Sequence, residues 1–168
     1  MRDHLSPPRP AERSLTPFDY AYRLLAQRSY SAVQLADKML AKGFTEAAVT
    51  RTVERLKEQG YLNDVRLAAD QAERLRQRGF GQARIRAKLT QQGIDADTAT
   101  DALASTSSDN EREDAKRFLA SRFSADTLKQ PKIAARAFRL LLSRGYPQDV
   151  AEQLLGSGLD SAGYAEEE

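Results

Sequence analysis

The chain has 168 residues, with 26 Lys and Arg against 24 Asp and Glu, a formal net charge of +2, one His and no Cys. The lack of cysteine excludes disulfides, thiolate nucleophiles and Cys-ligated zinc or iron–sulfur sites. The single His4 lies in a Pro-rich segment, which argues against a His-based metal site or catalytic triad. We therefore expect a protein that uses no metal or cofactor and is not an enzyme.

The composition is typical of a helical protein without membrane segments. Hydrophobic residues make up 40% of the chain and aromatic residues 7%, and many residues are Ala, Leu, Arg, Gln or Glu, which favour helices. No stretch approaches the ~20 apolar residues of a membrane span, and the first residues lack the apolar core of a secretory signal. We expect an all-α protein that is cytoplasmic and has no membrane partner.

Both ends of the sequence lack a helical pattern. Residues 1–16 contain Pro7, Pro8 and Pro10 with scattered charges, and residues 157–168 end in three glutamates. Such segments bury too little apolar surface to fold alone. We predict a disordered N-terminal tail over 1–16 and an acidic flexible C-terminal tail over 157–168.

The first periodic segment predicts two helices in succession. One begins after Pro17, a residue favoured in a first turn, and runs over 18–27. Ser31 and Gln34 then form a capping-box pattern, in which both side chains satisfy free backbone N–H groups at a helix start. The helix that follows is predicted to turn four apolar side chains inward: Val33, Leu35, Met39 and Leu40.

A third helix completes this first unit. Gly43 is predicted to end the second helix, because a glycine adopts the left-handed cap without a Cβ clash. Thr45 then caps a helix that ends at Gly60, and its apolar side chains recur at i, i+4 and i+7: Val49, Val53 and Leu56.

The same pattern recurs further along the chain. A shift of 50 residues aligns Leu35 with Ile85, Met39 with Leu89, Gly43 with Gly93, Phe44 with Ile94 and Val53 with Leu103. A further shift of 52 places Leu141, Gly145, Tyr146 and Leu155 in the corresponding positions of a more divergent copy. The sequence therefore predicts three tandem three-helix repeats that bury one another's faces.

These copies define the predicted domain organisation. The three repeats span 17–61, 62–105 and 109–156. The later helices are expected at 65–77, 82–91 and 96–104 in repeat 2 and at 111–123, 133–143 and 147–155 in repeat 3. The polar run Ser105–Ser108 is predicted to be a linker that leaves repeat 3 some freedom of orientation.

Charge is distributed unevenly along this helical array. Residues 74–94 carry six basic side chains and no acid, residues 95–114 have a net charge of −6, residues 115–145 of +7, and residues 146–168 of −6. Two basic blocks therefore fall on the first and second helices of repeats 2 and 3. Clustered arginines suit oxyanions or an acidic protein surface, although a solvated face of mixed charge is the plain alternative.

The acidic residues do not predict catalysis. Asp64, Asp70 and Glu73 lie near an exposed helix start without a nucleophile or metal cluster, and Asp64 itself is simply explained as a helix-start residue. There is no GxxxxGK[ST] phosphate loop. A binding protein is the better hypothesis.

The middle of the chain resembles the RecX family. The resemblance is carried by the string from Leu56 to Asp64, the string Arg78–Gly81, and Arg84, Ile85, Leu89 and Gly93–Ile94, and it extends over about residues 18–155. Asn63 and Gln92 are mild departures from the family pattern. The residues that carry the family signature are Gly60, Tyr61, Leu62, Asp64, Gly81, Ile85, Leu89 and Gly93.

The resemblance implies a non-catalytic regulator of homologous recombination, DNA repair and the SOS response. Family members form an elongated curved rod of three-helix repeats that binds the RecA–single-stranded-DNA filament. They inhibit its ATPase and strand exchange and promote filament disassembly. By this resemblance we expect a monomer whose partners are the RecA filament and, more weakly, single- and double-stranded DNA.

We predict that the basic blocks carry the RecA or DNA contact, through Arg74, Arg76, Arg78, Arg84, Arg86, Lys88, Lys132, Arg136 and Arg139. A stand-alone helix–turn–helix DNA-binding module is an alternative for residues 32–58, and a structural adaptor is another. The predicted recognition helix mixes basic residues with three glutamates, which suits a DNA groove poorly. Tyr61 is expected in the core or a turn, and Phe80 is equally compatible with packing and with base stacking.

Overall fold

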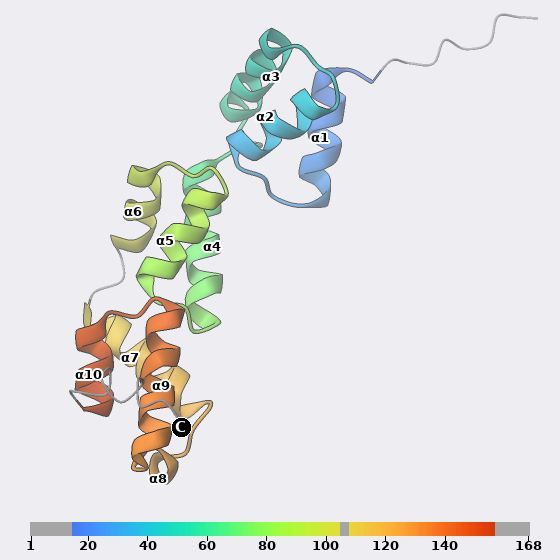
Figure 1. Cartoon of the computed structure of the whole chain (residues 1–168). Coiled ribbons are helices and arrows are strands. Elements are labelled where there is room, and N and C mark those ends of the chain that lie inside the picture. The colour runs from blue at the N-terminus through green and yellow to red at the C-terminus, as the bar shows by residue number, and fades with distance from the viewer. Residues whose placement is uncertain (1–14, 105–107, 157–168) are drawn as a thin grey trace, which may run out of the picture. The chain divides into compact units, whose positions relative to one another are not determined.

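The structure is a computed structural model that describes residues 15–104 and 108–156, and every regular element in those residues is an α-helix (Figure 1). The helices are α1 (Pro17–Gln27), α2 (Ala32–Ala41), α3 (Glu46–Glu58), α4 (Asp64–Gln77), α5 (Gln82–Gln91), α6 (Ala96–Ala104), α7 (Ser108–Ala120), α8 (Ala125–Leu128), α9 (Pro131–Arg144) and α10 (Gln148–Leu155). The all-α prediction is confirmed. No helix among these residues is long and apolar enough to cross a membrane.

The chain divides into two compact units. Unit 1, Met1–Leu62, holds α1 to α3, and unit 2, Asn63–Glu168, holds α4 to α10. Leu62 is buried in the core of unit 1, and its backbone N–H donates to the carbonyl oxygen of Leu56 at 3.1 Å. Repeat 1 therefore packs by itself, while repeats 2 and 3 pack together.

Unit 1 is a three-helix bundle whose core side chains come from all three helices. Leu35 and Met39 of α2 and Leu56 of α3 are fully buried, as predicted. Val33 and Leu40 were predicted to point inward, but they are 50% and 42% exposed. Leu35 and Met39 are four residues apart and share the inward face of α2, whereas the helical rotation of about 100° per residue places Val33 and Leu40 outside that face.

The predicted start and end of α2 are confirmed. The N–H of Gln34 donates to the Ser31 hydroxyl at 3.1 Å, and the N–H of Ser31 donates to the Gln34 side-chain carbonyl at 3.4 Å. After α2, Gly43 has a φ of +99°, the left-handed region where a side chain would be strained. Sequence signals at a few polar and glycine positions thus fix where α2 begins and ends.

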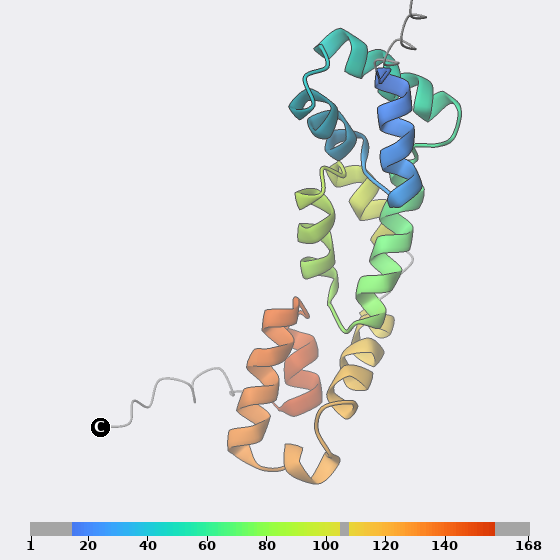
Figure 2. The same ribbon diagram turned by 90° about the vertical axis from the view of Figure 1, so that its right-hand side faces the viewer.

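Unit 2 repeats this arrangement twice. Helices α4, α5 and α6 pack around Ile85, Leu89 and Leu103, and α7, α9 and α10 pack around Phe138 and Leu141 (Figure 2). Ile85 and Leu89 are the predicted counterparts of Leu35 and Met39, and all four are buried. Gly93 and Gly145 both have positive φ, like Gly43. The predicted repeat therefore corresponds to a repeat of the fold.

Repeat 3 departs from the predicted helix bounds. The helix expected over 111–123 is α7, which begins at Ser108 and ends at Ala120. The additional helix α8 follows it, with the Ser124 hydroxyl accepting from the N–H of Thr127 at 3.3 Å. This four-residue helix lacks the apolar periodicity by which longer helices are predicted.

Three predicted segments lie outside the described residues wholly or in large part: the tail over 1–16, the tail over 157–168 and the linker over 105–108. The predicted freedom of orientation of repeat 3 can still be compared with the contacts that the described residues of repeats 2 and 3 make with each other. Those contacts join repeats 2 and 3 within unit 2 and are described next.

Candidate functional site

Repeats 2 and 3 meet where the turn before α5 touches the turn after α9. The backbone N–H of Gly81 donates to the carbonyl oxygen of Arg144 at 3.0 Å. A Cβ atom on Gly81 would lie 2.3 Å from the carbonyl oxygen of Gly145. Only glycine fits between these two backbones, so the predicted signature residue Gly81 has a structural role at this junction.

A second glycine, Gly145 in the turn after α9, also allows the two turns to approach closely. Gly145 has a φ of +87°, and a Cβ on it would lie 2.5 Å from the backbone nitrogen of Arg84. The Arg144 guanidinium also donates to the carbonyl oxygen of Arg78 at 3.3 Å. The two repeats are therefore joined through their main chains, and the freedom of repeat 3 expected from the linker sequence is not what the fold shows.

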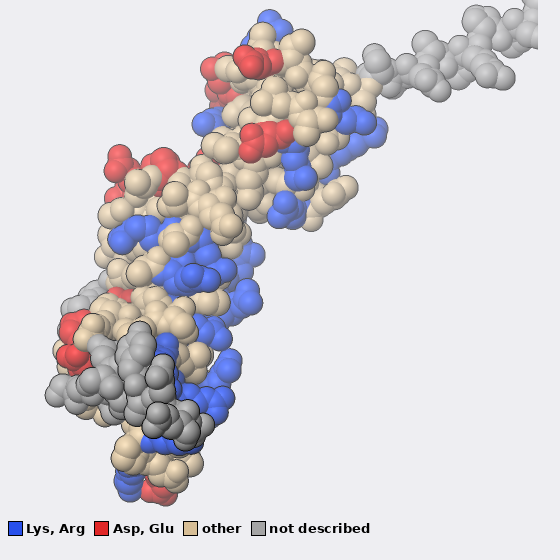
Figure 3. Space-filling view, in the orientation of Figure 1, with Lys and Arg blue, Asp and Glu red and all other residues tan. Residues whose placement is uncertain are grey.

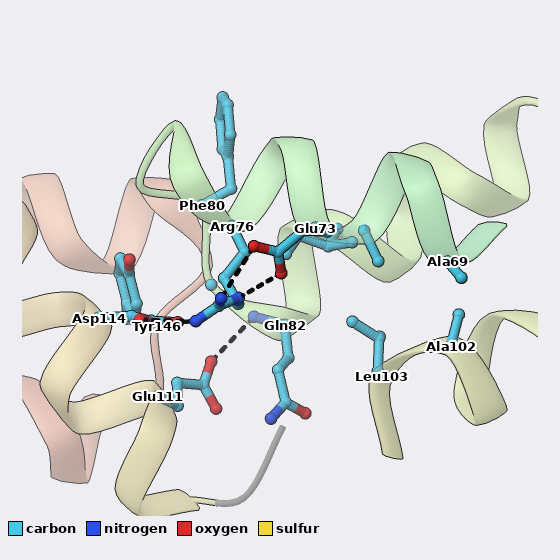
Figure 4. A pocket seen from close by; sticks show the side chains of 13 residues that line it. Ala69, Glu73, Arg76, Phe80, Gln82, Ala102, Leu103, Glu111, Asp114 and Tyr146 are labelled. Atoms are coloured by element: carbon cyan, nitrogen blue, oxygen red, sulfur yellow. Dashed lines mark hydrogen bonds and ion pairs between the residues drawn. The ribbon is translucent and has the colours of Figure 1, made fainter. Parts of the chain in front are cut away.

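An ion-pair cluster reinforces this junction (Figure 4). One guanidinium nitrogen of Arg76 on α4 lies 3.0 Å from both carboxylate oxygens of Asp114 on α7. Arg76 also pairs with Glu73 at 2.9 Å, and Arg117 pairs with the buried Asp114. These carboxylates hold the pKa of Arg76 above its usual value, and the hydrogen bonds from Arg76 and Gln77 lower that of Glu73.

This cluster gives one predicted contact residue a role within unit 2. Arg76 was predicted to contact RecA or DNA, and its guanidinium pairs with two carboxylates of unit 2 while 30% of its side chain stays exposed. The sequence shows the basic block but does not show which acids pair with it, because Asp114 lies 38 positions from Arg76 along the chain. Arg76 therefore stabilises the junction.

Glu111 caps α5 from the neighbouring repeat. Gly81, at the N-cap of α5, has no side chain to offer, and the N–H of Gln82 instead donates to the Glu111 carboxylate at 2.8 Å. Burial raises the pKa of Glu111 above its ordinary value, although this hydrogen bond opposes the shift. Figure 4 shows Glu111 reaching from α7 toward the first residue of α5.

A cavity of about 90 Å³ lies among these groups and is lined by Arg76, Phe80, Glu111, Asp114 and Tyr146. The Tyr146 hydroxyl is buried and has no hydrogen-bond partner among the described residues. Burial raises the pKa of Tyr146 to about 12. The space is small, and ion-paired side chains of the junction form part of its lining, so it belongs to the junction.

Beside the junction, several basic side chains make cation–π contacts with the rings of Phe80 and Phe118. The Arg144 guanidinium lies 4.7 Å from the ring centre of Phe80 and 5.0 Å from that of Phe118. The ammonium of Lys88 lies 5.2 Å from the Phe80 ring, and the Arg122 guanidinium lies 5.3 Å from the Phe118 ring. Such cation–π contacts order long basic side chains.

The basic surface continues onto repeat 3. Arg122, Arg136 and Arg139 line an open hollow of about 540 Å³ with Phe123 and Leu140. We call the basic side chains around Phe80, Phe118 and this hollow, together with Arg84 on α5, the basic band; its members are Arg78, Arg84, Lys88, Arg122, Arg136, Arg139 and Arg144. Figure 3 shows Lys and Arg over α5 and along one edge of unit 2, with most of the acidic side chains in this view at the opposite edge and a few beside basic ones at the end that holds α8.

The remaining predicted contact residues are distributed as follows. Arg84 and Lys88 are four residues apart on α5 and share a face, whereas Arg86, two residues from each, points elsewhere. The side chain of Arg74 donates to the carbonyl oxygen of Asp70 at 3.0 Å. Lys132 is exposed on the same face of α9 as Arg136 and Arg139.

Arg122 and Arg144 are members of the band that the sequence analysis did not select. Both lie in the basic block over 115–145, but the sequence around them does not distinguish them from the other basic residues of that block. What distinguishes them is the ring of Phe118, which each guanidinium approaches. Phe118, four positions before Arg122, is a usable sequence signal even though Arg122 lies in the turn just after α7. Arg144 can be found only from the tertiary fold.

Unit 1 presents a surface of mixed charge. On α3 the exposed side chains include Arg51, Glu54 and Glu58, and the Arg55 guanidinium lies 4.7 Å from the ring centre of Phe18. Tyr61 was predicted to lie in the core or in a turn; it lies in the turn after α3 and is exposed.

The acidic residues are placed without a catalytic arrangement. Asp64 is the first residue of α4, which is capped by Asn63 through a 2.9 Å hydrogen bond from the N–H of Arg66. Asp70 is exposed, and Glu73 binds Arg76. Within residues 15–104 and 108–156 no three His, Cys, Asp or Glu side chains form a group that could hold a metal ion.

Family comparisons match the first two repeats. The family model described as RecX, first three-helix domain, matches residues 18–56, and that of the second three-helix domain matches residues 63–103. Regulatory protein RecX of Leptothrix cholodnii is 35% identical over 135 residues, which cover 80% of this chain and 84% of that protein. Regulatory protein RecX of Legionella pneumophila (strain Corby) is 33% identical over 138 residues, or 82% and 91% of the two chains.

Solved structures show the same fold. A crystal structure of a regulatory protein RecX has a TM-score of 0.71 at 20% identity, covering 84% of this chain and 72% of that one. RecX from Lactobacillus salivarius has a TM-score of 0.69 at 19% identity, covering 86% and 95%. Both coverages extend well beyond the first two repeats.

Proposed function

The chain belongs to the RecX family of regulatory proteins, and on that premise we propose that it binds the RecA–single-stranded-DNA filament through the basic band. In this proposal it inhibits the ATPase and strand exchange of RecA and promotes loss of the filament. It acts as a monomer in the cytoplasm, by binding and without catalysis. The observation that carries the proposal is that Arg144 of repeat 3 lies over the Phe80 ring of repeat 2 and the Phe118 ring of repeat 3, so that basic side chains of both repeats meet at one place.

The chemistry of the band suits a nucleoprotein filament. Its arginines present planar donor groups that bind carboxylates and phosphates with two hydrogen bonds each. A surface of one sign attracts an acidic protein face or a phosphate backbone and speeds association in a salt-dependent manner. In the face that Figure 3 shows, most acidic side chains of unit 2 lie at the edge opposite the basic ones.

The junction between repeats 2 and 3 makes the band a preorganised surface. The Gly81–Arg144 hydrogen bond, the Arg76–Asp114 ion pair and the Glu111 cap fix the two repeats together. Contacts spread over a fixed surface act as linked weak sites, with little conformational entropy lost on binding.

Regulation follows from differential affinity. If the band fits one arrangement of RecA subunits better than another, binding shifts the filament toward that arrangement by the difference in binding free energy. An arrangement unable to exchange strands or hydrolyse ATP is then populated at the expense of the active one. No bond has to be broken by this protein.

A stand-alone helix–turn–helix DNA-binding module is the second candidate. Helices α2 and α3 have the required succession, with Gly43 in the turn. The exposed side of α3 alternates acidic and basic residues, and Arg55 contacts Phe18. A recognition helix is expected to offer a basic or amide-rich face to the major groove, so unit 1 supports this function less well than the band supports the first.

The proposal is tested by measuring RecA-dependent ATP hydrolysis and strand exchange on single-stranded DNA, with and without this protein. We expect both rates to fall as the protein is added, and more strongly at low salt than at high salt. Unchanged rates at saturating protein would contradict the proposal.

A further inference from the structure

Unit 1 carries an exposed aromatic cluster that the proposed function does not use. The ring centres of Phe18 and Tyr22 on α1 lie 6.5 Å apart with an interplanar angle of 16°. The Tyr22 ring meets that of Tyr61 edge-on at 5.5 Å. The Arg55 guanidinium lies over Phe18 at 4.7 Å. Three rings and one guanidinium from α1, α3 and the turn after α3 are thus assembled at one place.

The cluster is open to solvent. Tyr22 is 47% exposed and Tyr61 is 53% exposed. Together with Phe18, Arg55 and Gln59 they line an open hollow of about 420 Å³. Exposed large rings gathered on one surface of a small protein are a usual mark of a binding site, because folding alone would bury them.

The lining indicates the chemistry of the ligand. All five lining residues present planar groups: three rings, a guanidinium and an amide. None is aliphatic, so the hollow is unlike the apolar grooves that receive leucine or isoleucine side chains. Rings and guanidinium planes stack on flat π systems, and the Gln59 amide can both donate to and accept from the edge of a base.

We propose that this aromatic cluster binds an unpaired base of single-stranded nucleic acid by stacking. Tyr22 and Tyr61 offer the stacking faces, Arg55 offers a charge for the adjacent phosphate and Gln59 reaches the base edge. A duplex keeps its bases stacked on one another, so the site selects single strands. The site lies wholly in unit 1 and needs neither RecA nor the basic band.

Tyrosine fluorescence of the full chain gives a direct test. Because the chain has six Tyr and no Trp, its emission comes from tyrosine, and stacking of a base quenches it. The probe is an oligodeoxythymidylate of about 12 nucleotides, within the span of known single-strand sites. We expect quenching by this probe and far weaker quenching by an oligomer of the same length that carries phosphates and sugars but no bases.

Substitutions separate stacking from electrostatics. The change of Tyr61→Ala or Tyr22→Ala is expected to weaken binding of the probe by about 5- to 150-fold, whereas Tyr61→Phe keeps most of the affinity because the ring remains. The matched control is Leu40→Ala, which removes another exposed apolar side chain of unit 1 and is expected to change nothing. The tyrosine variants should leave the dependence of affinity on salt unaltered, since no phosphate contact is lost.

Several results would overturn the inference. The inference is wrong if Tyr61→Ala and Tyr22→Ala bind the probe as tightly as the wild-type protein does. It is also wrong if the wild-type protein binds the base-free oligomer as tightly as the probe. If the two alanine variants lost RecA binding while keeping the oligonucleotide, the cluster would be a protein docking site. Because the probe is measured without RecA, failure here leaves the proposed regulation of RecA untouched, and failure of that regulation leaves this site untouched.

Discussion

The close approach of the two turns predicts that Gly81→Ala destabilises unit 2. The added Cβ would lie 2.3 Å from the carbonyl oxygen of Gly145 and 2.6 Å from the backbone nitrogen of Tyr146. Both are main-chain atoms, and the Tyr146 N–H is held by the carbonyl oxygen of Leu141 at 3.1 Å. The clash therefore cannot be relieved by rotating a side chain, and the two repeats must separate.

The size of the effect follows from two opposing contributions. Overpacking against rigid atoms costs about 1–3 kcal/mol. Gly81 has a φ of −78°, which alanine adopts without strain, so the substitution also stabilises the fold by about 0.4–1 kcal/mol through the unfolded chain. We expect a net loss of about 1–2 kcal/mol, because the partners are backbone atoms, and a fall in the midpoint of thermal unfolding of roughly 5–10 °C.

Thermal and urea unfolding followed by far-ultraviolet circular dichroism measure this loss. The control is Gly60→Ala in unit 1, where no atom lies within 4 Å of the added Cβ but φ is +73°. That variant is expected to lose about 1–2 kcal/mol through backbone strain alone, without opening the contact between repeats 2 and 3. A Gly81→Ala protein as stable as the wild type, or more so, would refute the close approach of the repeats.

Three further predictions concern the junction. Arg76→Ala is expected to lower the free energy of unfolding by about 1–3 kcal/mol while leaving RecA inhibition intact at temperatures where the variant is folded, because it leaves the buried Asp114 with Arg117 alone; circular dichroism and ATPase assays check this. In Glu111→Gln, the amide oxygen can still cap α5. Because the pKa of Glu111 is raised, the folded state favours the protonated acid, so the wild type is stabilised below the ordinary pKa of 4.5 and loses that contribution as the pH rises through the folded pKa. Thermal unfolding should therefore show the stability of the variant rising relative to that of the wild type as the pH increases above 4.5. Tyr146→Phe removes a buried hydroxyl without a partner among the described residues, so unfolding experiments should find its stability unchanged or raised.

Much of the fold could be predicted because its signals are local. The capping box at Ser31 and the glycines at 43 and 93 mark helix ends by backbone chemistry that acts within a few residues. Val33 and Leu40 were misplaced for the opposite reason: α2 is apolar on more than one side, so periodicity alone does not say which side meets the core.

The candidate site was predictable as a charge pattern but not as a surface. Counting basic residues finds both blocks, yet it gives Arg76, which is paired, the same weight as Arg84, which is exposed. It also passes over Arg144, whose importance depends on contacts with Phe80 and Phe118 from other helices. These distinctions arise from contacts between residues far apart in sequence, which spacing cannot reveal.

Inhibition of the RecA ATPase by two charge-reversed variants tests the central claim most directly. The band variant combines Arg122→Glu with Arg139→Glu, and the control combines Arg51→Glu with Arg66→Glu, two exposed arginines outside the band. Both variants change the net charge equally, so non-specific electrostatics affect them alike. We predict that the band variant needs at least about tenfold more protein for half inhibition, while the control matches the wild type. Equal inhibition by the two variants would contradict the assignment of the basic band as the RecA-filament contact.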